Sequence, residues 1–299
     1  MEKVETKVET MEQIRETGVT LDDGRVLHAY EAVSADPSAA ASFNARTPVF
    51  WLHGTPNIGA PPEPLFAAAA EHGLRWVSYD RPGYGGSSPN PGRNIASAAR
   101  DVAAVADALG IGRFAVLGHS GGGPHALGCA AVLGDRVVGA VAISGLAPYP
   151  EGHEDAWFAG MYPGGVATMR AARAGREARE AYLAVEEYDP EMFTPGDHEA
   201  LEGDWKWIMS VVGPALEGDP GGMIDDDVAY AHPWGCDPAA IAVPVLLLHG
   251  DADRIDPSSH SESLARQIPN ATLRISPGDG HLSILHHAAE AVAWLGSRR

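Results

Sequence analysis

The 299-residue sequence predicts an α/β protein built on a mostly parallel, eight-stranded sheet with helices on both faces. The first observation is a series of short, almost continuously apolar runs, which are typical of strands covered on both faces of a parallel sheet. The second is the alternation of these runs with segments of helical periodicity. The third is an N-terminal pair of strand-like segments joined by a Gly-containing turn, which indicates an antiparallel hairpin.

The individual elements follow in order along the chain. Residues 19–21 and 25–33 flank the turn at 22–24 and predict the hairpin. Helices are expected over 95–109, which Gly110 can end, and over 288–295. The remaining six strands are expected near residues 48–52, 76–79, 114–117, 138–143, 245–248 and 272–275.

The interval 146–237 breaks this alternation of strands and helices. It is helix-like, rich in Trp, Met, Tyr and Glu, and contains no convincing strand. We therefore expect a core domain formed by residues 16–145 and 238–299, into which 146–237 is inserted. Residues 1–15 form a charged lead-in to which we assign no function.

Charge and composition exclude several classes of protein. A formal net charge of -19 disfavours binding to nucleic acid or to an anionic membrane surface. No apolar run approaches the roughly 18 residues of a membrane span, and the N-terminus lacks the apolar core of a secretion signal. The two cysteines form neither a disulfide framework nor a metal-binding spacing. These features predict a cytoplasmic protein that binds neither nucleic acid nor a membrane, and no metal site.

A G-x-S-x-G pattern at residues 118–122 follows the apolar run at 114–117 directly and precedes a helix-permissive segment. This pattern predicts a serine on a sharp strand-to-helix turn. The flanking glycines are needed because a Cβ there would collide with the neighbouring strand or helix. The turn lifts the Ser120 hydroxyl clear of the sheet, so Ser120 is the candidate nucleophile.

An acid and a histidine follow in the order Ser120, Asp253, His281, each after a predicted strand. A serine hydroxyl is a weak nucleophile that needs a base within hydrogen-bond reach. His281 is the candidate base, because an imidazole can take and return a proton near neutral pH. Asp253 is expected to orient the imidazole. Its neighbours Asp251 and Asp256 are assigned to turn formation and solvation.

These residues belong to four separated segments that together resemble the α/β-hydrolase superfamily. The resemblance spans residues 18–295 and includes distant similarity to proline iminopeptidases and epoxide hydrolases. The segments are H-G-x-P at 53–56, D-x-x-G-x-G-x-S at 80–87, the serine turn at 118–122, and G-x-x-D-x-x-x-P at 250–257 followed by Gly280-His281.

The resemblance implies the α/β-hydrolase fold, with 146–237 as a helical lid over the active site. It also implies an oxyanion hole formed by the backbone N–H groups of Thr55 and Gly121. The lid side chains are expected either to line a substrate pocket or to pack the lid onto the core. The candidate substrate-binding residues are His53, which also shapes the oxyanion turn, Trp157, Trp205 and Met209.

The identity of the candidate nucleophile limits the types of reaction that we expect. Epoxide hydrolases of this superfamily carry an aspartate where this chain has Ser120, so we expect an acyl-serine route. The leading prediction is hydrolysis of a carboxylic ester of a small or medium substrate, without cofactor or metal. We expect a small-molecule substrate as the partner and a monomer or homodimer. Carbon–carbon bond hydrolysis or peracid formation would use the same three residues.

Two alternatives come from other readings of the same residues. A proline-iminopeptidase-like aminopeptidase would use acids of the lid to hold an ammonium group, but that family's H-G-G-P-G turn is H-G-T-P-N at 53–57 here. A non-catalytic binding protein on the same scaffold is the other alternative. The acids considered for the ammonium group of an aminopeptidase substrate are Glu186, Glu187, Glu202 and Asp204.

The acidic run 225–227 lacks the spacing of a calcium loop, and we expect a solvated helix start there.

Overall fold

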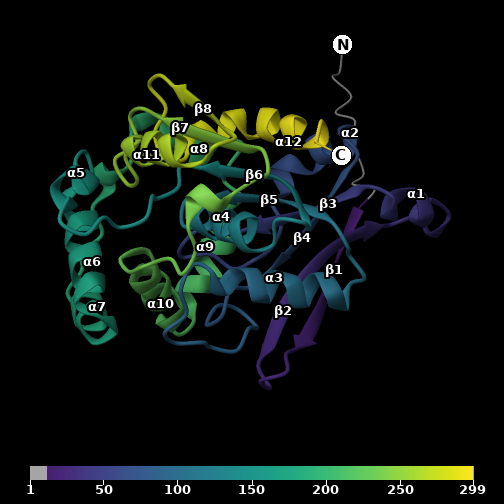
Figure 1. The fold of residues 1–299 in the computed structure, drawn as a ribbon, viewed down its shortest axis with the longest axis horizontal. Coiled ribbons are helices and arrows are strands. Elements are labelled where there is room, and N and C mark those ends of the chain that lie inside the picture. The colour runs from purple at the N-terminus through teal and green to yellow at the C-terminus, as the bar shows by residue number, and fades with distance from the viewer. Residues whose placement is uncertain (1–11, 299) are drawn as a thin grey trace, which may run out of the picture.

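The computed structural model describes residues 12–298, in which a single sheet has the strand order β1-β2-β4-β3-β5-β6-β7-β8 (Figure 1). The β1–β2 and β2–β4 pairs are antiparallel, and the other pairs are parallel. The predicted eight-stranded, mostly parallel sheet is therefore confirmed. The strands are β1 Glu12–Thr20, β2 Val26–Ser34, β3 Thr47–Leu52, β4 Leu74–Tyr79, β5 Phe114–His119, β6 Val137–Ile143, β7 Val245–Gly250 and β8 Ala271–Ser276.

The first strand begins earlier than the sequence predicts. β1 pairs with β2 from Glu12, opposite Ser34, to Thr20, opposite Val26. Residues 12–15, which we expected in the charged lead-in, therefore belong to the sheet, whereas residues 1–11 lie outside the described part. The strand escaped prediction because it lies at the sheet edge, where most of its side chains are solvated and no apolar run is needed.

Helices cover both faces of the sheet, as predicted. Alternate residues of the strands point to opposite faces, so Phe50 and Leu52 of β3 join one apolar cluster and Val49 and Trp51 join the other. The first cluster includes residues of α3, α4 and α11, and the second includes residues of α1, α2 and α12. Figure 1 shows α3 and α12 on opposite sides of the strands. These helices are α1 Ala40–Asn44, α2 Phe66–Glu71, α3 Ser97–Ala108, α4 Gly122–Val132, α11 Ser259–Gln267 and α12 Ala288–Gly296.

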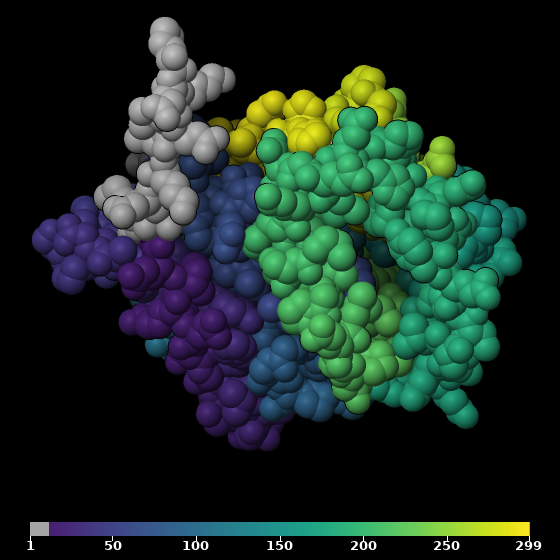
Figure 2. Space-filling view, turned by 180° about the vertical axis from the view of Figure 1, so that it is seen from behind, coloured from purple at the N-terminus to yellow at the C-terminus, as the bar shows by residue number. Residues whose placement is uncertain are grey.

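The interval between β6 and β7 is helical, and no strand forms there within the described residues. Figure 1 shows α5 to α7 stacked beside the sheet, with α10 between them and the core. Figure 2 shows the surface hollowed between the teal helices α5 to α7 and the green helices α9 and α10. The helices are α5 Glu154–Phe158, α6 Pro163–Ala174, α7 Arg176–Leu183, α8 Pro195–Glu202, α9 Ile208–Glu217 and α10 Gly221–Tyr230.

The insertion packs against the core at both apolar clusters. Trp157 and Phe158 of α5 join the cluster that contains α4, and Trp205 and Ile208 join the cluster that contains α12. Short 3-10 helices complete the fold at Pro37–Ala39, Glu63–Leu65, Pro190–Met192, Pro238–Ala240 and Ser283–His287. Among residues 12–298, no helix has both the length and the apolar character that crossing a membrane requires.

The junction between β5 and α4 is packed backbone against backbone. A Cβ added at Gly118 would lie 2.1 Å from the carbonyl oxygen of Gly122. A Cβ added at Gly122 would lie 1.8 Å from the carbonyl oxygen of Leu52, at the end of the neighbouring strand β3. Any side chain at these two positions must therefore move one backbone segment away from another.

We predict that Gly122→Ala destabilises the protein by about 3 kcal/mol, the upper part of the usual range for overpacking, because the displaced atoms are backbone. Gly112→Ala is the matched control, since a Cβ there meets nothing within 4 Å. Its free energy of unfolding should stay within about 1 kcal/mol of the wild type. Urea unfolding of the three proteins measures the difference, and equal stabilities would contradict the packing argument.

Candidate active site

Ser120 lies on the turn between β5 and α4 in a backbone conformation that is rare for a residue with a side chain. Its φ angle is 55°, in the left-handed region. Backbone hydrogen bonds hold it there: its N–H donates to the carbonyl of Ile143 at 2.8 Å, and its carbonyl accepts from Gly123 at 2.9 Å. The half-buried side chain is thereby directed away from the strand that carries it.

The structure brings Ser120, His281 and Asp253 into one hydrogen-bonded line. In the neutral form of His281, the Ser120 hydroxyl donates to Nε2 at 2.8 Å, and Nδ1–H of His281 donates to Oδ2 of Asp253 at 2.8 Å. The three residues follow β5, β8 and β7, whose carboxyl ends lie at the same edge of the parallel sheet. The geometry has the connectivity of a nucleophile, a base and an orienting acid.

The Asp253 carboxylate is held by several donors. Its Oδ1 accepts the N–H groups of Ile255 at 2.9 Å and Asp256 at 3.0 Å. A second histidine, His249, places Nε2 3.3 Å from Oδ2 of Asp253. Burial by itself raises the pKa of Asp253, but the charge of His281 and the hydrogen bonds from both histidines outweigh it and hold the pKa well below its usual range. The acid therefore stays ionised beside the imidazole.

The environment of His281 favours its protonated form. Burial of the ring by itself lowers the pKa of His281, but the facing carboxylate of Asp253 outweighs this effect and raises the pKa to about 9. The more distant carboxylates of Asp256 and Asp197 act in the same direction. These carboxylates therefore stabilise the imidazolium relative to the neutral ring.

The loop that carries His281 is fixed from two sides. His119 donates Nε2–H to the carbonyl oxygen of His281 at 2.9 Å. Burial, together with the charge of His281, lowers the pKa of His119 to about 3, so its ring is neutral. On the other side, Asp197 of α8 accepts the N–H groups of Leu282 and Ser283, each at 2.8 Å. A residue of the insertion thus supports the loop of the base.

Thr55 and Gly121, the predicted oxyanion residues, lie next to Ser120. A Cβ added at Gly121 would lie 2.6 Å from Oγ1 of Thr55, and one added at Gly54 would lie 3.6 Å from Cβ of Ser120. Within residues 12–298, the N–H groups of Thr55 and Gly121 donate no hydrogen bond to another protein group. Both donors therefore remain available beside the Ser120 hydroxyl.

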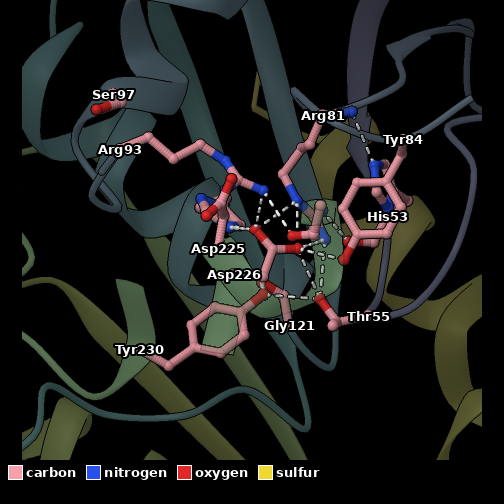
Figure 3. A network of polar contacts seen from close by, with 12 residues as sticks. His53, Thr55, Arg81, Tyr84, Arg93, Ser97, Gly121, Asp225, Asp226 and Tyr230 are labelled. Atoms are coloured by element: carbon pink, nitrogen blue, oxygen red, sulfur yellow. Dashed lines mark hydrogen bonds and ion pairs between the residues drawn. The ribbon is translucent and has the colours of Figure 1, made fainter. Parts of the chain in front are cut away.

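The oxyanion turn contacts a buried cluster of charges centred on Asp226 of α10 (Figure 3). The Asp226 side chain has no exposed surface. Burial by itself raises the pKa of Asp226, but the guanidinium groups of Arg81 and Arg93 outweigh it and hold the pKa well below its usual range. The carboxylate accepts from Arg81 Nη2 at 2.6 Å, Arg93 Nη2 at 2.8 Å, and the hydroxyls of Tyr84 and Thr55, each at 2.9 Å.

This cluster corrects the expectation of a solvated helix start at 225–227. The three aspartates lie in the interior of α10 and are all buried. Asp225 pairs with Arg176 at 2.9 Å, and Asp227 pairs with Arg179 at 2.7 Å. The prediction was wrong because the neutralising arginines are distant in the sequence. Within the described residues, no group of three His, Cys, Asp or Glu side chains could hold a metal ion.

Within the described residues, none of the four candidate substrate-binding residues is hydrogen-bonded to Ser120, Asp253 or His281. His53 has no exposed surface, and its Nδ1 and Nε2 atoms bond the carbonyl of Gly54 at 2.8 Å and the N–H of Arg81 at 3.0 Å. These contacts make His53 part of the support of the turn, and its contact with a substrate stays a prediction.

The remaining three candidates lie in the insertion. Trp157 is buried and donates its indole N–H to the carbonyl of Ala147 at 3.0 Å, so it packs the insertion onto the core. Trp205 is buried and borders a surface groove of about 1010 Å³ beside Trp207 and Leu285. Met209 is 56% exposed. Within residues 12–298, none of these side chains has a hydrogen bond or ring contact with the triad.

Four residues of the site were missed by sequence reasoning: Asp197, Asp226, Tyr230 and His249. A signal existed for Asp197, because Thr194 and Asp197 have the spacing of a capping box, which forms at the start of α8. Asp226, Tyr230 and His249 carry no local pattern that marks them.

The sheet order, the serine turn after β5 and the chain order of Ser120, Asp253 and His281 define a protein of the α/β-hydrolase class. A family model described as the alpha/beta hydrolase family matches residues 49–294. The chain therefore belongs to the alpha/beta hydrolase family.

Known proteins are similar over most of the chain. A 2-hydroxymuconate semialdehyde hydrolase from Pseudomonas putida is 30% identical over 255 residues, which cover 81% of this chain and 83% of that protein. A non-heme haloperoxidase from Rhodococcus erythropolis is 28% identical over 247 residues, covering 78% of this chain and 85% of that protein. The solved structure of an enol-lactonase from Burkholderia xenovorans has a TM-score of 0.67 and 20% identity, covering 94% of this chain and 98% of that one.

We predict that Asp256→Asn moves the titration of His281 to lower pH. Asp256 is 5% exposed, and burial raises its pKa to about 7. The pKa of His281 is raised above its ordinary value, and the charge of the Asp256 carboxylate contributes to this rise because it favours the imidazolium. Removing this charge should therefore lower the pKa of His281.

NMR of the protein carrying ¹³C-labelled histidine follows this titration, with His281→Gln assigning the resonance. Asp251→Asn is the matched control, because it removes the same charge from an exposed position in the same loop. An unchanged midpoint in Asp256→Asn, or an equal shift in the control, would contradict the role given to Asp256.

Proposed function

We propose that this protein is a serine hydrolase that cleaves a carboxylic ester of a small or medium substrate through an acyl-enzyme, without cofactor or metal. The observation that carries the proposal is the line of two 2.8 Å hydrogen bonds from Ser120 through His281 to Asp253. The free N–H groups of Thr55 and Gly121 beside Ser120 add to it. Such a line lets the neutral imidazole accept the serine proton and so makes the hydroxyl nucleophilic.

In the acylation step, Oγ of Ser120 attacks the ester carbonyl carbon while its proton passes to Nε2 of His281. The carbonyl π electrons move to oxygen, and the N–H groups of Thr55 and Gly121 donate to this oxyanion. Collapse of the tetrahedral intermediate breaks the bond to the alcohol oxygen. His281 gives its proton to that oxygen, and the acyl group remains on Ser120.

Deacylation repeats these transfers with water as the nucleophile. His281 takes a proton from water, the hydroxide oxygen bonds the acyl carbon, and the oxyanion again meets the two N–H donors. The Ser120 oxygen then leaves and recovers its proton from His281. Asp253 keeps its charge throughout and holds the imidazole in one orientation.

In this proposal the segment 146–237 acts as a lid on a core formed by the rest of the chain. The hollow between α5 to α7 and the helices α9 and α10 in Figure 2 supports an opening on this face. The packing of Trp157 and Trp205 into the core favours a lid whose ends are fixed.

The aminopeptidase alternative receives less support from the acids of the insertion. Glu186 accepts from the hydroxyl of Thr168 at 2.7 Å and pairs with Arg179 at 3.0 Å, so its charge is already neutralised. Glu187, Glu202 and Asp204 are exposed on the surface. The intact hydrogen-bonded line at Ser120 also favours an enzyme over a non-catalytic binding protein. Ester hydrolysis therefore remains the proposal.

Ser120→Ala should lower kcat on an aryl ester by about a thousandfold or more, because the variant lacks the attacking oxygen. Release of p-nitrophenol from p-nitrophenyl butyrate measures the rate. Ser42→Ala, which removes a hydroxyl from the exposed end of the molecule at α1, should retain the wild-type rate. A rate in Ser120→Ala close to that of the wild type would reject the covalent route.

A fluorophosphonate should attach to the wild type once, at Ser120, because only an activated serine displaces fluoride from phosphorus. Mass spectrometry of the labelled peptide locates the site, and a label elsewhere would count against Ser120.

In a separate assay, the wild type should hydrolyse p-nitrophenyl esters faster than prolyl p-nitroanilide. The reverse preference would favour the aminopeptidase over the ester hydrolase.

A further inference from the structure

We propose that helix α10 of the insertion is part of the oxyanion site, with Tyr230 as the residue that positions both of its backbone donors. This inference rests on the proposed function and adds a role for the insertion in stabilising the transition state. It concerns a tyrosine that touches neither Ser120 nor His281 by a hydrogen bond within the described residues.

The hydroxyl of Tyr230 joins the two residues that supply the oxyanion donors. Its oxygen lies 2.9 Å from Oγ1 of Thr55 and 2.9 Å from the carbonyl oxygen of Gly121 (Figure 3). Tyr230 is 2% exposed, so water does not compete for these contacts. The single proton of Thr55 is donated to Asp226, so the single proton of Tyr230 is shared between the carbonyl oxygen of Gly121 and Oγ1 of Thr55.

Close packing makes this contact a positional constraint. A Cβ added at Gly121 would lie 2.3 Å from the Tyr230 oxygen and 2.6 Å from Oγ1 of Thr55. The two side chains therefore press directly on the Gly121 backbone. An oxyanion donor is effective only when it points at the place where the charge develops. A small rotation of Gly121 or Thr55 therefore weakens the stabilisation of the transition state and leaves the binding of the substrate almost unchanged.

Asp226 fixes the helix that carries Tyr230. Its carboxylate binds Arg81 and Arg93 of the core, and Arg81 also donates to the carbonyl of Gly54 at 2.9 Å, inside the oxyanion turn. The ring of His125 places Nε2 3.4 Å from the same carboxylate. Separating α10 from the core would leave these buried charges without partners, which is strongly unfavourable. We therefore expect α10 to stay in place while the lid admits substrate.

Tyr230→Phe tests the proposal, because it removes the shared hydroxyl and keeps the ring. We expect kcat on p-nitrophenyl butyrate to fall about tenfold while KM stays within about twofold, since the ground state does not use the oxyanion donors. The inhibition constant of an aryl trifluoromethyl ketone should rise by a similar factor. In that adduct the Ser120 oxygen bonds the ketone carbon, its proton passes to His281, and the ketone oxygen becomes the oxyanion.

Tyr30→Phe is the matched control. Tyr30 is also buried, and its hydroxyl donates to Asp80 at 3.0 Å and makes no hydrogen bond to Thr55, Gly121 or Asp226 within the described residues. We expect its kcat and inhibition constant to change less than about threefold. Equal losses in the two variants, or no loss in Tyr230→Phe, would overturn the positioning role.

Thr55→Ala breaks the same bridge from its other end and keeps the backbone N–H, so it carries the test if Tyr230→Phe does not fold. The double variant should be no slower than the slower single variant, because both changes remove one shared interaction. Additive losses would contradict the proposal. Circular dichroism and thermal melts establish that each variant is folded.

Labelling and inhibition of the wild-type protein distinguish a failure of this inference from a failure of the proposed function on which it rests. If the wild type takes the fluorophosphonate at Ser120 and binds the ketone, the hydrolase function stands and only the variants decide the role of Tyr230. If the wild type does neither, the proposed function and this inference are both wrong.

Discussion

The close approach of backbones at the turn between β5 and α4 is the constraint on which the rest of the site depends. Gly118 and Gly122 leave no room for a side chain, and Ser120 adopts a left-handed conformation between them. This turn puts the serine at the carboxyl edge of a central strand, with β3 on one side and β6 on the other. The oxyanion turn after β3 is therefore a neighbour of Ser120 as a consequence of strand order.

Two buried carboxylates hold the two halves of the site, and each is kept ionised by different partners. Asp253 is stabilised by His281, His249 and backbone N–H groups, so its charge is coupled to the proton that the base carries. Asp226 is stabilised by the guanidinium groups of Arg81 and Arg93. In the proposed mechanism the first carboxylate serves proton transfer, because it faces the imidazole of His281, and the second holds a fixed geometry, because it faces guanidinium groups.

The insertion contributes more than a cover to this arrangement. Asp197 of α8 binds the loop that follows His281, and Asp226 of α10 binds the turn that contains Thr55. Each is almost completely buried. The insertion is thus tied to the loop of His281 on one side and to the turn of Thr55 on the other.

The sequence by itself determined the sheet and the order of its elements along the chain, and it pointed to Ser120, Asp253 and His281, which the structure brings together. Apolar runs and glycine-rich turns are local features, and the required backbone conformation at residues 118–122 limits which residues can occupy them. Only the tertiary structure decided how the acids of the insertion are used. The burial of Asp226, the bridge made by Tyr230 and the structural place of His53 depend on partners more than a hundred residues away or on complete desolvation. A local sequence pattern does not indicate contacts between residues that are far apart in the sequence, because charge pairing and burial are properties of the packed chain.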